Sequence, residues 1–166
     1  MLCFRTTPVP ADREHVARML HATGFFEAAP DEVDVAVEQI EKTLRLGSEA
    51  VDYRFFFACE QDQLRGYVCY VKAACTLTTY EIYWLCVDPL YQHAGLGKQL
   101  VEKVMEAMQR EGGCKLVVQT AGREKYAPTQ RFYLSCGFVE EARIKDYYAP
   151  GDDTLFYTLT TALTTK

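Results

Sequence analysis

Residues 85–98 read LCVDPLYQHAGLGK, and this stretch decides how the rest of the chain is interpreted. It begins as the end of an apolar run, residues 82–87, whose composition is typical of a buried strand. Pro89 has no backbone N–H, so a regular central strand should end there. Gly95 and Gly97 are the conformationally permissive positions of the short loop that follows. We therefore expect a strand, a glycine loop and a helix in succession.

The helix after this loop is predicted from its apolar residues, which recur at helical spacing at Leu100, Val101, Val104, Met105 and Met108. Gly112 and Gly113 end the pattern, as glycines commonly do at a helix C-terminus. The N–H groups of the loop and of the first helical turn would point toward one place, and the helix dipole makes that place attractive to anions. The stretch therefore predicts a pyrophosphate-binding loop.

Three families of phosphate-binding loop share this arrangement, and the residues that each motif requires at given positions distinguish them. A Walker A loop requires a glycine at the position of Gln92 and a serine or threonine at that of Gln99. A dinucleotide-binding fingerprint that starts at Gly95 requires a third glycine, where Leu100 stands. Neither motif is complete, so a nucleotide-phosphate-binding protein is a distant alternative.

Residues 92–97, QHAGLG, fit the third family: they resemble the Q/R-x-x-G-x-G/A loop of the GNAT superfamily of acetyl-CoA-dependent N-acetyltransferases. The resemblance includes the lead-in VDP at residues 87–89 and the segment RFYLSCGF at residues 131–138. Two motifs in the family's order, about a helix and a strand apart, form a strong signal. The resemblance covers nearly the whole chain and is sharpest at residues 80–139.

Hydrophobic periodicity and turn residues predict the other elements. Strands are expected at residues 2–6, 53–60, 67–74, 80–87, 115–119, 138–144 and 154–161. One helix is expected after Asp12 through about residue 22, a second from residue 30 to about residue 46 and a third at residues 128–136, in addition to the one after the glycine loop. The order β-α-α-β-β-β-α-β-α-β-β is that of the GNAT fold. It implies one α/β domain over residues 1–166, with a mixed, mostly antiparallel central sheet flanked by helices.

Several boundaries depend on individual residues. Asp12 is expected to cap the first helix, and Pro30 is expected to start the second. Residues 61–66 and residues 147–153 are rich in turn-forming residues, so each predicts a loop between two strands.

The composition is ordinary for a soluble globular protein, with 49% hydrophobic and 25% charged residues. The net charge of −5 argues against nucleic acid or an anionic membrane surface as the main partner, and it permits a cationic substrate. No apolar run approaches the ~20 residues that a membrane span needs. The first residues, MLCF, lead directly into charge and proline rather than into a signal peptide.

Cysteine usage indicates the compartment. The chain has 7 cysteines, an odd number, with no C-x-x-C pair and with most of them inside apolar, strand-like runs. We interpret them as reduced, buried thiols of a cytoplasmic protein. The 3 histidines show no ligand spacing with the cysteines, so no metal site is predicted.

The resemblance implies a set of cofactor contacts for acetyl-CoA. The strand before the loop would bind the pantetheine arm through the backbone of Leu85, Cys86 and Val87, with one N–H polarising the thioester carbonyl. The pyrophosphate would lie on the loop residues Gln92, His93, Ala94, Gly95, Leu96, Gly97 and Lys98. Tyr126 stands near the place where the family commonly has a cofactor-binding asparagine.

The resemblance also implies the catalytic groups. Glu81 lies where histone-type members keep the base that deprotonates the amine, and Tyr133 lies where the family often has the acid that protonates the departing thiolate. A solvated carboxylate and a packed tyrosine are the plain structural alternatives for these two residues. Cys86 is a poor nucleophile, because its apolar context should raise its thiol pKa. Direct attack by the bound amine is therefore preferred over an acetyl-enzyme.

The acceptor site is implied by the first two helices and by the loop between the last two strands. Its candidate residues are the aromatic and acidic side chains Phe25, Phe26, Tyr83, Tyr147, Asp152 and Asp153. Aromatic rings beside carboxylates hold cations well, although a capped turn with scattered aromatic residues explains the same pattern.

The sequence thus predicts transfer of an acetyl group from acetyl-CoA to a primary amine of a small molecule or a peptide. The main alternative is a noncatalytic acyl-CoA-binding or regulatory module on the same fold. A homodimer is compatible with the sequence.

Overall fold

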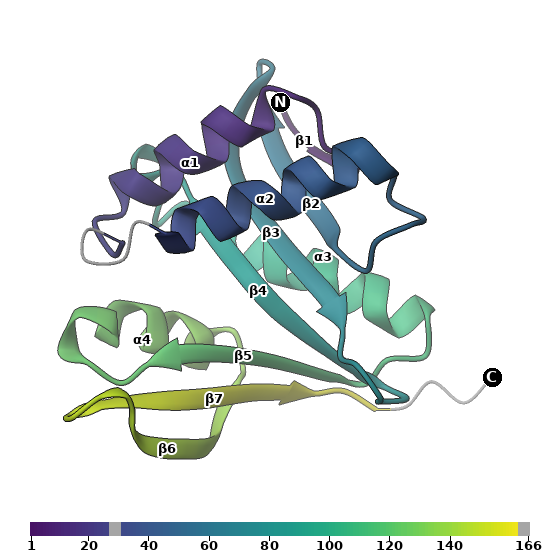
Figure 1. Ribbon diagram of the computed structural model, residues 1–166. Coiled ribbons are helices and arrows are strands. Elements are labelled where there is room, and N and C mark those ends of the chain that lie inside the picture. Colours follow the sequence, from purple (N-terminus) through teal and green to yellow (C-terminus); the bar gives the residue numbers. More distant parts are fainter. Residues whose placement is uncertain (27–30, 163–166) are drawn as a thin grey trace. The chain divides into compact units, whose positions relative to one another are not determined.

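The structure is a computed structural model, and it describes residues 1–26 and 31–162. Its helices and strands follow the predicted order (Figure 1). The helices are α1 (Asp12–Ala22), α2 (Asp31–Leu46), α3 (Leu96–Arg110) and α4 (Ala127–Ser135), with short 3-10 helices η1 (Pro89–Tyr91) and η2 (Glu124–Tyr126). The strands are β1 (Leu2–Arg5), β2 (Arg54–Glu60), β3 (Gln63–Lys72), β4 (Thr79–Val87), β5 (Lys115–Ala121), β6 (Val139–Ala149) and β7 (Asp152–Thr160).

The seven strands form one sheet in the order β1-β2-β3-β4-β5-β7-β6. β4 and β5 run parallel, whereas the pairs β1–β2, β2–β3, β5–β7 and β6–β7 are antiparallel. The predicted fold class, a mixed and mostly antiparallel sheet with flanking helices, is therefore confirmed. By its internal packing the chain divides into two compact units, residues 1–71 with 84–104, and residues 72–83 with 105–166.

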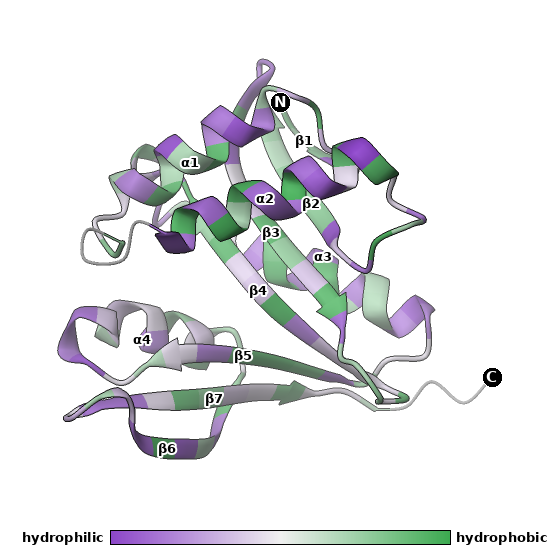
Figure 2. Ribbon diagram, viewed as in Figure 1, coloured by the Kyte–Doolittle hydropathy of each residue, from purple (hydrophilic) through white to green (hydrophobic). Residues whose placement is uncertain are grey.

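The first unit is built around α1, α2 and the strands β2 and β3. Val16 and Leu20 of α1 and Ile40 of α2 are fully or almost fully buried together with Phe57 and Tyr67 of the two strands. Both helices are amphipathic, and Figure 2 shows hydrophilic and hydrophobic residues alternating along them. Burial of this apolar stripe stabilises helices of this length more than their intrinsic propensity does.

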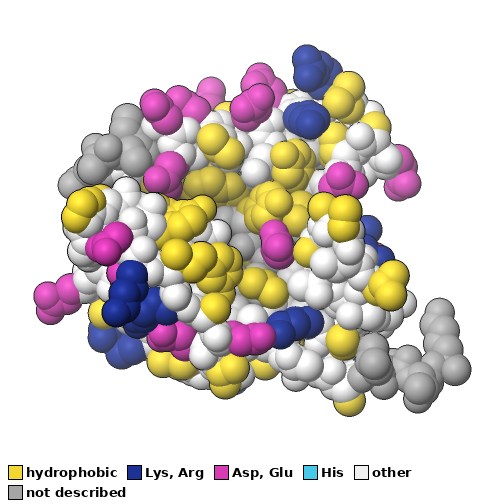
Figure 3. Space-filling view, turned by 60° about the horizontal axis from the view of Figure 1, so that its bottom comes forward, with side chains coloured by type: hydrophobic (Ala, Val, Ile, Leu, Met, Phe, Trp, Pro, Cys, Tyr) yellow, Lys and Arg dark blue, Asp and Glu magenta, His cyan; other side chains and the backbone are white. Residues whose placement is uncertain are grey.

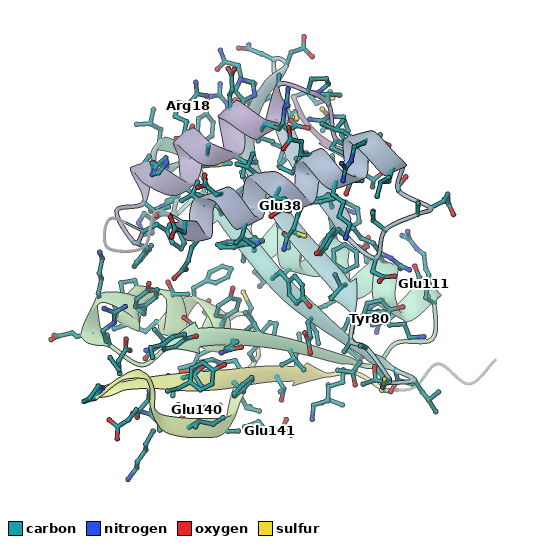
Figure 4. The ribbon with its side chains drawn as sticks, in the orientation of Figure 1. Arg18, Glu38, Tyr80, Glu111, Glu140 and Glu141 are labelled. Carbon is teal, nitrogen blue, oxygen red and sulfur yellow. The ribbon has the colours of Figure 1, made fainter. Side chains whose placement is uncertain are left out.

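The second unit has its core around β5 and β7. Leu116 of β5 and Leu155 of β7 are completely buried. Tyr80, at the start of β4, is also buried, and its hydroxyl donates a hydrogen bond to Glu111 at 2.8 Å (Figure 4). Gly113 follows α3 here, and a Cβ at this position would lie 2.6 Å from the Tyr80 ring, so only glycine lets the chain turn this closely.

Both predicted loops are shorter than expected, because tight turns suffice. Residues 61–66 contain only a two-residue turn, at Gln61 and Asp62, which both have positive φ values of 50° and 61° as a type I′ turn requires. The prediction of a loop over residues 147–153 is likewise wrong. Tyr147 and Tyr148 belong to β6, Asp152 and Asp153 belong to β7, and only Pro150 and Gly151 connect the strands.

Two helix starts also differ from the prediction. Asp12 is the first residue of α1 rather than its cap; its carboxylate accepts the Val9 N–H at 2.7 Å and pairs with Arg5 at 2.7 Å. The glycine loop is shorter than expected, because α3 begins at Leu96 and includes Gly97. The predicted role of Pro30 falls outside the described residues.

Candidate active site

The end of β4 leaves backbone groups available. Its parallel ladder with β5 covers only Thr79–Ile82, whereas β4 continues to Val87. The N–H and C=O groups of Leu85, Cys86 and Val87 therefore take no part in that ladder, and the Val87 carbonyl accepts the Gln92 side-chain amide at 3.4 Å. Cys86 itself is 5% exposed, and burial, with a smaller contribution from Asp88, raises the pKa of its thiol to about 12. The thiol stays protonated near neutral pH, which makes it a poor nucleophile.

A compact turn follows β4. The Asp88 carboxylate accepts the Leu90 N–H at 3.0 Å, and the Asp88 carbonyl accepts the Tyr91 N–H at 2.7 Å. Pro89 occupies the first position of η1, where a missing N–H costs nothing. The VDP lead-in of the sequence thus has a physical role, because it ends the strand and sets the direction of the next residues.

The glycine loop, residues 92–95, is exposed throughout. His93 and Gly95 both have positive φ, 64° and 79°, and no atom lies within 4 Å of the position that a Gly95 Cβ would occupy. The Gly95 carbonyl accepts the Gln99 N–H at 3.1 Å, so the helix starts directly after it. The N–H groups of the first turn, from Leu96 to Lys98, have no acceptor within the helix. An open loop leading into a helix N-terminus is well suited to a pyrophosphate.

The candidate base, Glu81, lies in the part of β4 that belongs to the second unit. It is half-buried and sits opposite Val117 of β5, which in turn sits opposite Thr158 of β7. Tyr83 is 47% exposed and, two residues further along the strand, points to the same face.

The candidate acid, Tyr133, lies on α4 of the same unit. Its ring packs against Phe138 at 5.4 Å and stacks on Tyr157 at 6.3 Å between ring centroids. Tyr157 sits opposite Val118 and therefore belongs to the other face of the sheet from Glu81. The two candidates lie on opposite faces of this part of the sheet. The Tyr133 side chain is 5% exposed, and burial raises its pKa above the ordinary value.

The acidic residues of the predicted acceptor site already have cationic partners. Asp152 is buried and pairs with Arg123 at 2.9 Å. Asp153 accepts the Asp146 N–H at 3.0 Å and pairs with Arg143 at 3.1 Å, and these contacts lower its pKa.

The aromatic candidates remain accessible. Tyr147 and Tyr148 are about half exposed and pack edge to face at 4.9 Å between centroids, and the Gln119 amide donates to the Tyr148 hydroxyl at 3.1 Å. In the first unit, the ring centroids of Phe26 and Trp84 are 5.8 Å apart, and the Phe25 N–H donates to the Thr23 hydroxyl.

The edge strand β6 presents a further polar feature of the second unit. Lys115 pairs with Glu141 at 2.8 Å, and Arg143 pairs with Glu140 at 3.1 Å. Charged side chains of both signs lie next to one another over this edge (Figure 3), and Figure 4 marks the two glutamates on β6. These pairs are exposed, so they add little to stability.

Two arginines near the predicted site were not expected from the sequence. Arg123 pairs with Asp152 and lies over the Tyr126 ring at 5.5 Å, and Arg65 lies over the Tyr91 ring at 4.2 Å. The Arg123–Asp152 and Arg65–Tyr91 contacts join residues far apart in the chain, whereas Arg123 and Tyr126 belong to the same local turn. A local signal for Arg65 is that it directly precedes Gly66.

The family of the chain follows from comparison with known proteins. The model of the acetyltransferase (GNAT) family matches residues 17–138. The chain therefore belongs to the GNAT family of acetyltransferases, as its two motifs indicated.

Individual relatives agree with this assignment. A crystal structure of a protein from Desulfovibrio desulfuricans, assigned to the same family, is 41% identical with a TM-score of 0.92, covering 98% of this chain and 100% of that one. The structure of yncA from Salmonella typhimurium with its cofactor acetyl-CoA is 19% identical with a TM-score of 0.73, covering 100% and 97% of the two chains, and it shares the fold.

One curated relative matches over a shorter stretch. N-alpha-acetyltransferase 30 of Xenopus laevis is 39% identical over 72 residues, which are 43% of this chain and 25% of that protein. The matched part thus spans a quarter of the relative's length. Among the described residues, no helix is long and apolar enough to cross a membrane.

Proposed function

We propose that the chain acts as one acetyltransferase domain over residues 1–166 that moves an acetyl group from acetyl-CoA to a primary amine. The amine belongs to a small molecule or to a peptide and attacks directly, with both substrates bound. The observation that carries this proposal is the exposed glycine loop between β4 and α3, with positive φ at His93 and Gly95, in a member of the GNAT family.

The first unit would hold the cofactor. The loop residues 92–95 and the first helical turn, through Lys98, offer N–H groups to the pyrophosphate, and Lys98 adds a positive charge. Leu85, Cys86 and Val87 offer backbone groups to the pantetheine arm, since these are not used in the ladder with β5. The solved relative that contains acetyl-CoA supports this choice of donor. When bound, the donor supplies the electrophilic thioester carbonyl, and a β4 N–H would stabilise its developing negative charge.

The second unit would supply the proton-transfer groups. An alkylamine has a pKa near ~10, so it must lose a proton before it attacks. Glu81 would accept that proton, directly or through a water molecule that Tyr83 helps to hold. Both side chains point to the same face of β4, which supports this pairing of roles.

Tyr133 would act on the leaving group. Its raised pKa means that it keeps its hydroxyl proton at neutral pH and is available as a donor. The same raised pKa makes complete transfer to a thiolate of pKa near ~8.5 unfavourable, so a hydrogen bond that strengthens as charge reaches the sulfur is the larger contribution. Tyr126, the last residue of η2 and the N-cap of α4, would add a cofactor contact.

Acceptor binding would rely on aromatic side chains more than on carboxylates. Tyr147 is 55% exposed, whereas Asp152 and Asp153 are already paired with arginines. We assign Phe25, Phe26 and Tyr83 to the same role. Rings of this kind accept both cationic and neutral alkylamines.

The free thiols support a cytoplasmic location. All seven cysteines are free; Cys59, Cys69 and Cys86 are buried as expected, whereas Cys3 and Cys75 are exposed, contrary to the expectation. Such thiols persist most readily in a reducing compartment.

The test is thiol release from acetyl-CoA across a panel of primary amines and peptides, with CoA affinity measured by calorimetry on the same preparation. Amine-dependent release with an N-acetylated product supports the proposal. CoA binding without release for any amine would favour the noncatalytic module, and the absence of CoA binding would overturn both.

A further inference from the structure

Arg65 occupies an irregular position in β3. The β2–β3 register places Ala58 opposite Gly66 and Cys59 opposite Leu64, so Arg65 is an extra residue on its strand. This is a β-bulge, and bulges redirect a side chain away from the regular alternation of the strand.

The redirected residue contacts both ends of the turn that leads into the glycine loop. Its carbonyl accepts the Asp88 N–H at 2.8 Å, and its guanidinium lies 4.2 Å from the centre of the Tyr91 ring. The Arg65 Nε is buried and has no hydrogen-bond partner among the described residues. The cation–π contact with the Tyr91 ring holds the guanidinium in place.

Gly66, the next residue of β3, packs close to the helix that follows the glycine loop. A Cβ at Gly66 would lie 3.1 Å from the Cys86 carbonyl oxygen, 3.2 Å from Leu100 and 3.4 Å from Leu96. The first turn of α3 therefore packs directly on the β3 backbone. Arg65 thus contacts the turn that precedes residues 92–95, and Gly66 packs against the helix that follows them. Two adjacent residues of β3 hold the glycine loop from its two ends.

We propose that Arg65 is a positioning residue for the cofactor, and that it holds the turn at residues 88–91 so that the glycine loop is ordered for pyrophosphate before binding. The inference rests on the proposed function. It follows from the energetics of binding, because a loop that is already ordered need not lose its conformational freedom when the anion binds. The effect should be confined to the phosphate end of the donor.

The test compares two acetyl donors, acetyl-CoA and S-acetylpantetheine, which lacks the pyrophosphate. Arg65→Met keeps the aliphatic stem and removes the cation. It should raise KM for acetyl-CoA by ~5- to 30-fold, the range expected for a partly buried cation–π contact, with kcat unchanged. KM for S-acetylpantetheine should stay at the wild-type value. Arg65→Lys, which keeps the charge but lacks the planar group, should recover only part of the affinity.

Tyr91→Leu provides the second arm, because the effect of Arg65 passes through this ring. It should also raise KM for acetyl-CoA, and the double variant should be no worse than the more impaired single variant. Lys42→Met is the matched control. It removes a cation of α2 whose Nζ lies 5.8 Å from the centre of the Tyr53 ring, and it should leave both KM values unchanged.

Unchanged acetyl-CoA affinity in folded Arg65→Met would overturn the inference, as would equal losses with both donors or fully additive effects of the two substitutions. If the wild-type protein binds no CoA, the proposed function itself fails. Wild-type binding with unaffected variants overturns only the role of Arg65.

Discussion

Tyr133 is buried, and we propose that its hydroxyl acts on the leaving group; an experiment can separate the packing role from the catalytic one. Phenylalanine keeps the ring that packs on Phe138 and Tyr157, so Tyr133→Phe should change the melting temperature little. It removes the donor to the leaving sulfur and should reduce kcat by ~10- to 10³-fold with CoA affinity nearly intact. Steady-state kinetics and calorimetry on one preparation check this. A lower melting temperature with wild-type kcat would mean that the hydroxyl is structural, and Tyr126 becomes the next residue to test.

Glu81 is the residue that we propose as the general base. Glu81→Gln preserves size and polarity but cannot accept a proton, so kcat near neutral pH should fall by ~10²-fold, the lower end for general-base catalysis. The loss should shrink as the pH rises, because more of the amine is then already unprotonated. The measurement is kcat against pH for both proteins. A variant with wild-type kcat at neutral pH would direct attention to Tyr83 or to a water chain.

The glycine loop, residues 92–95, is the proposed binding site of the pyrophosphate. Gly95 has open space around its Cβ position but a φ of 79°, so a side chain is opposed by backbone strain rather than by a steric clash. Gly95→Val should shift the loop and weaken CoA binding by at least ~10-fold, while the remaining helices and strands persist. Calorimetry together with circular dichroism checks the prediction. Unchanged CoA affinity in a folded variant would contradict the assignment of the loop.

The sequence predicted the elements better than it predicted their contacts. Periodicity and glycines are local signals, so they indicated the order of elements and the loop before α3. The loop of the last hairpin was predicted too long, over residues 147–153, because Pro150 and Gly151 favour a loop; the Asp146 carboxylate accepts the Gly151 N–H at 2.6 Å and closes a tighter turn. The ring contact of Arg65 and the ion pair of Asp152 join residues distant in sequence, and no local pattern reports them.

At the scale of the whole molecule, buried thiols and phenols should make the free energy of unfolding fall at alkaline pH. Burial raises the pKa of Cys69, Cys86 and Tyr67. Unfolded thiols ionise near ~8.5, whereas these folded groups stay protonated. The unfolded state then binds fewer protons, so the free energy of unfolding should fall as pH rises, by up to ~1.4 kcal/mol per pH unit for each group.

This stability is fully present below about pH 8 and is lost toward the folded pKa, about 12 for Cys86. Urea unfolding at stepped pH values checks the trend. Cys69→Ser removes one titrating group and should make the slope shallower. A free energy of unfolding that does not change up to pH ~10.5 would contradict the buried, protonated state of these groups.

We propose that the chain passes the acetyl group from acetyl-CoA to an amine without an acetyl-enzyme. Initial rates measured while both acetyl-CoA and an active amine are varied test this proposal. Direct transfer predicts intersecting double-reciprocal lines, with N-acetylated product formed in equal amount to released CoA. Parallel lines would indicate an acetyl-enzyme and contradict direct transfer, and the absence of N-acetylated product with any amine would contradict acetyl transfer to amines altogether.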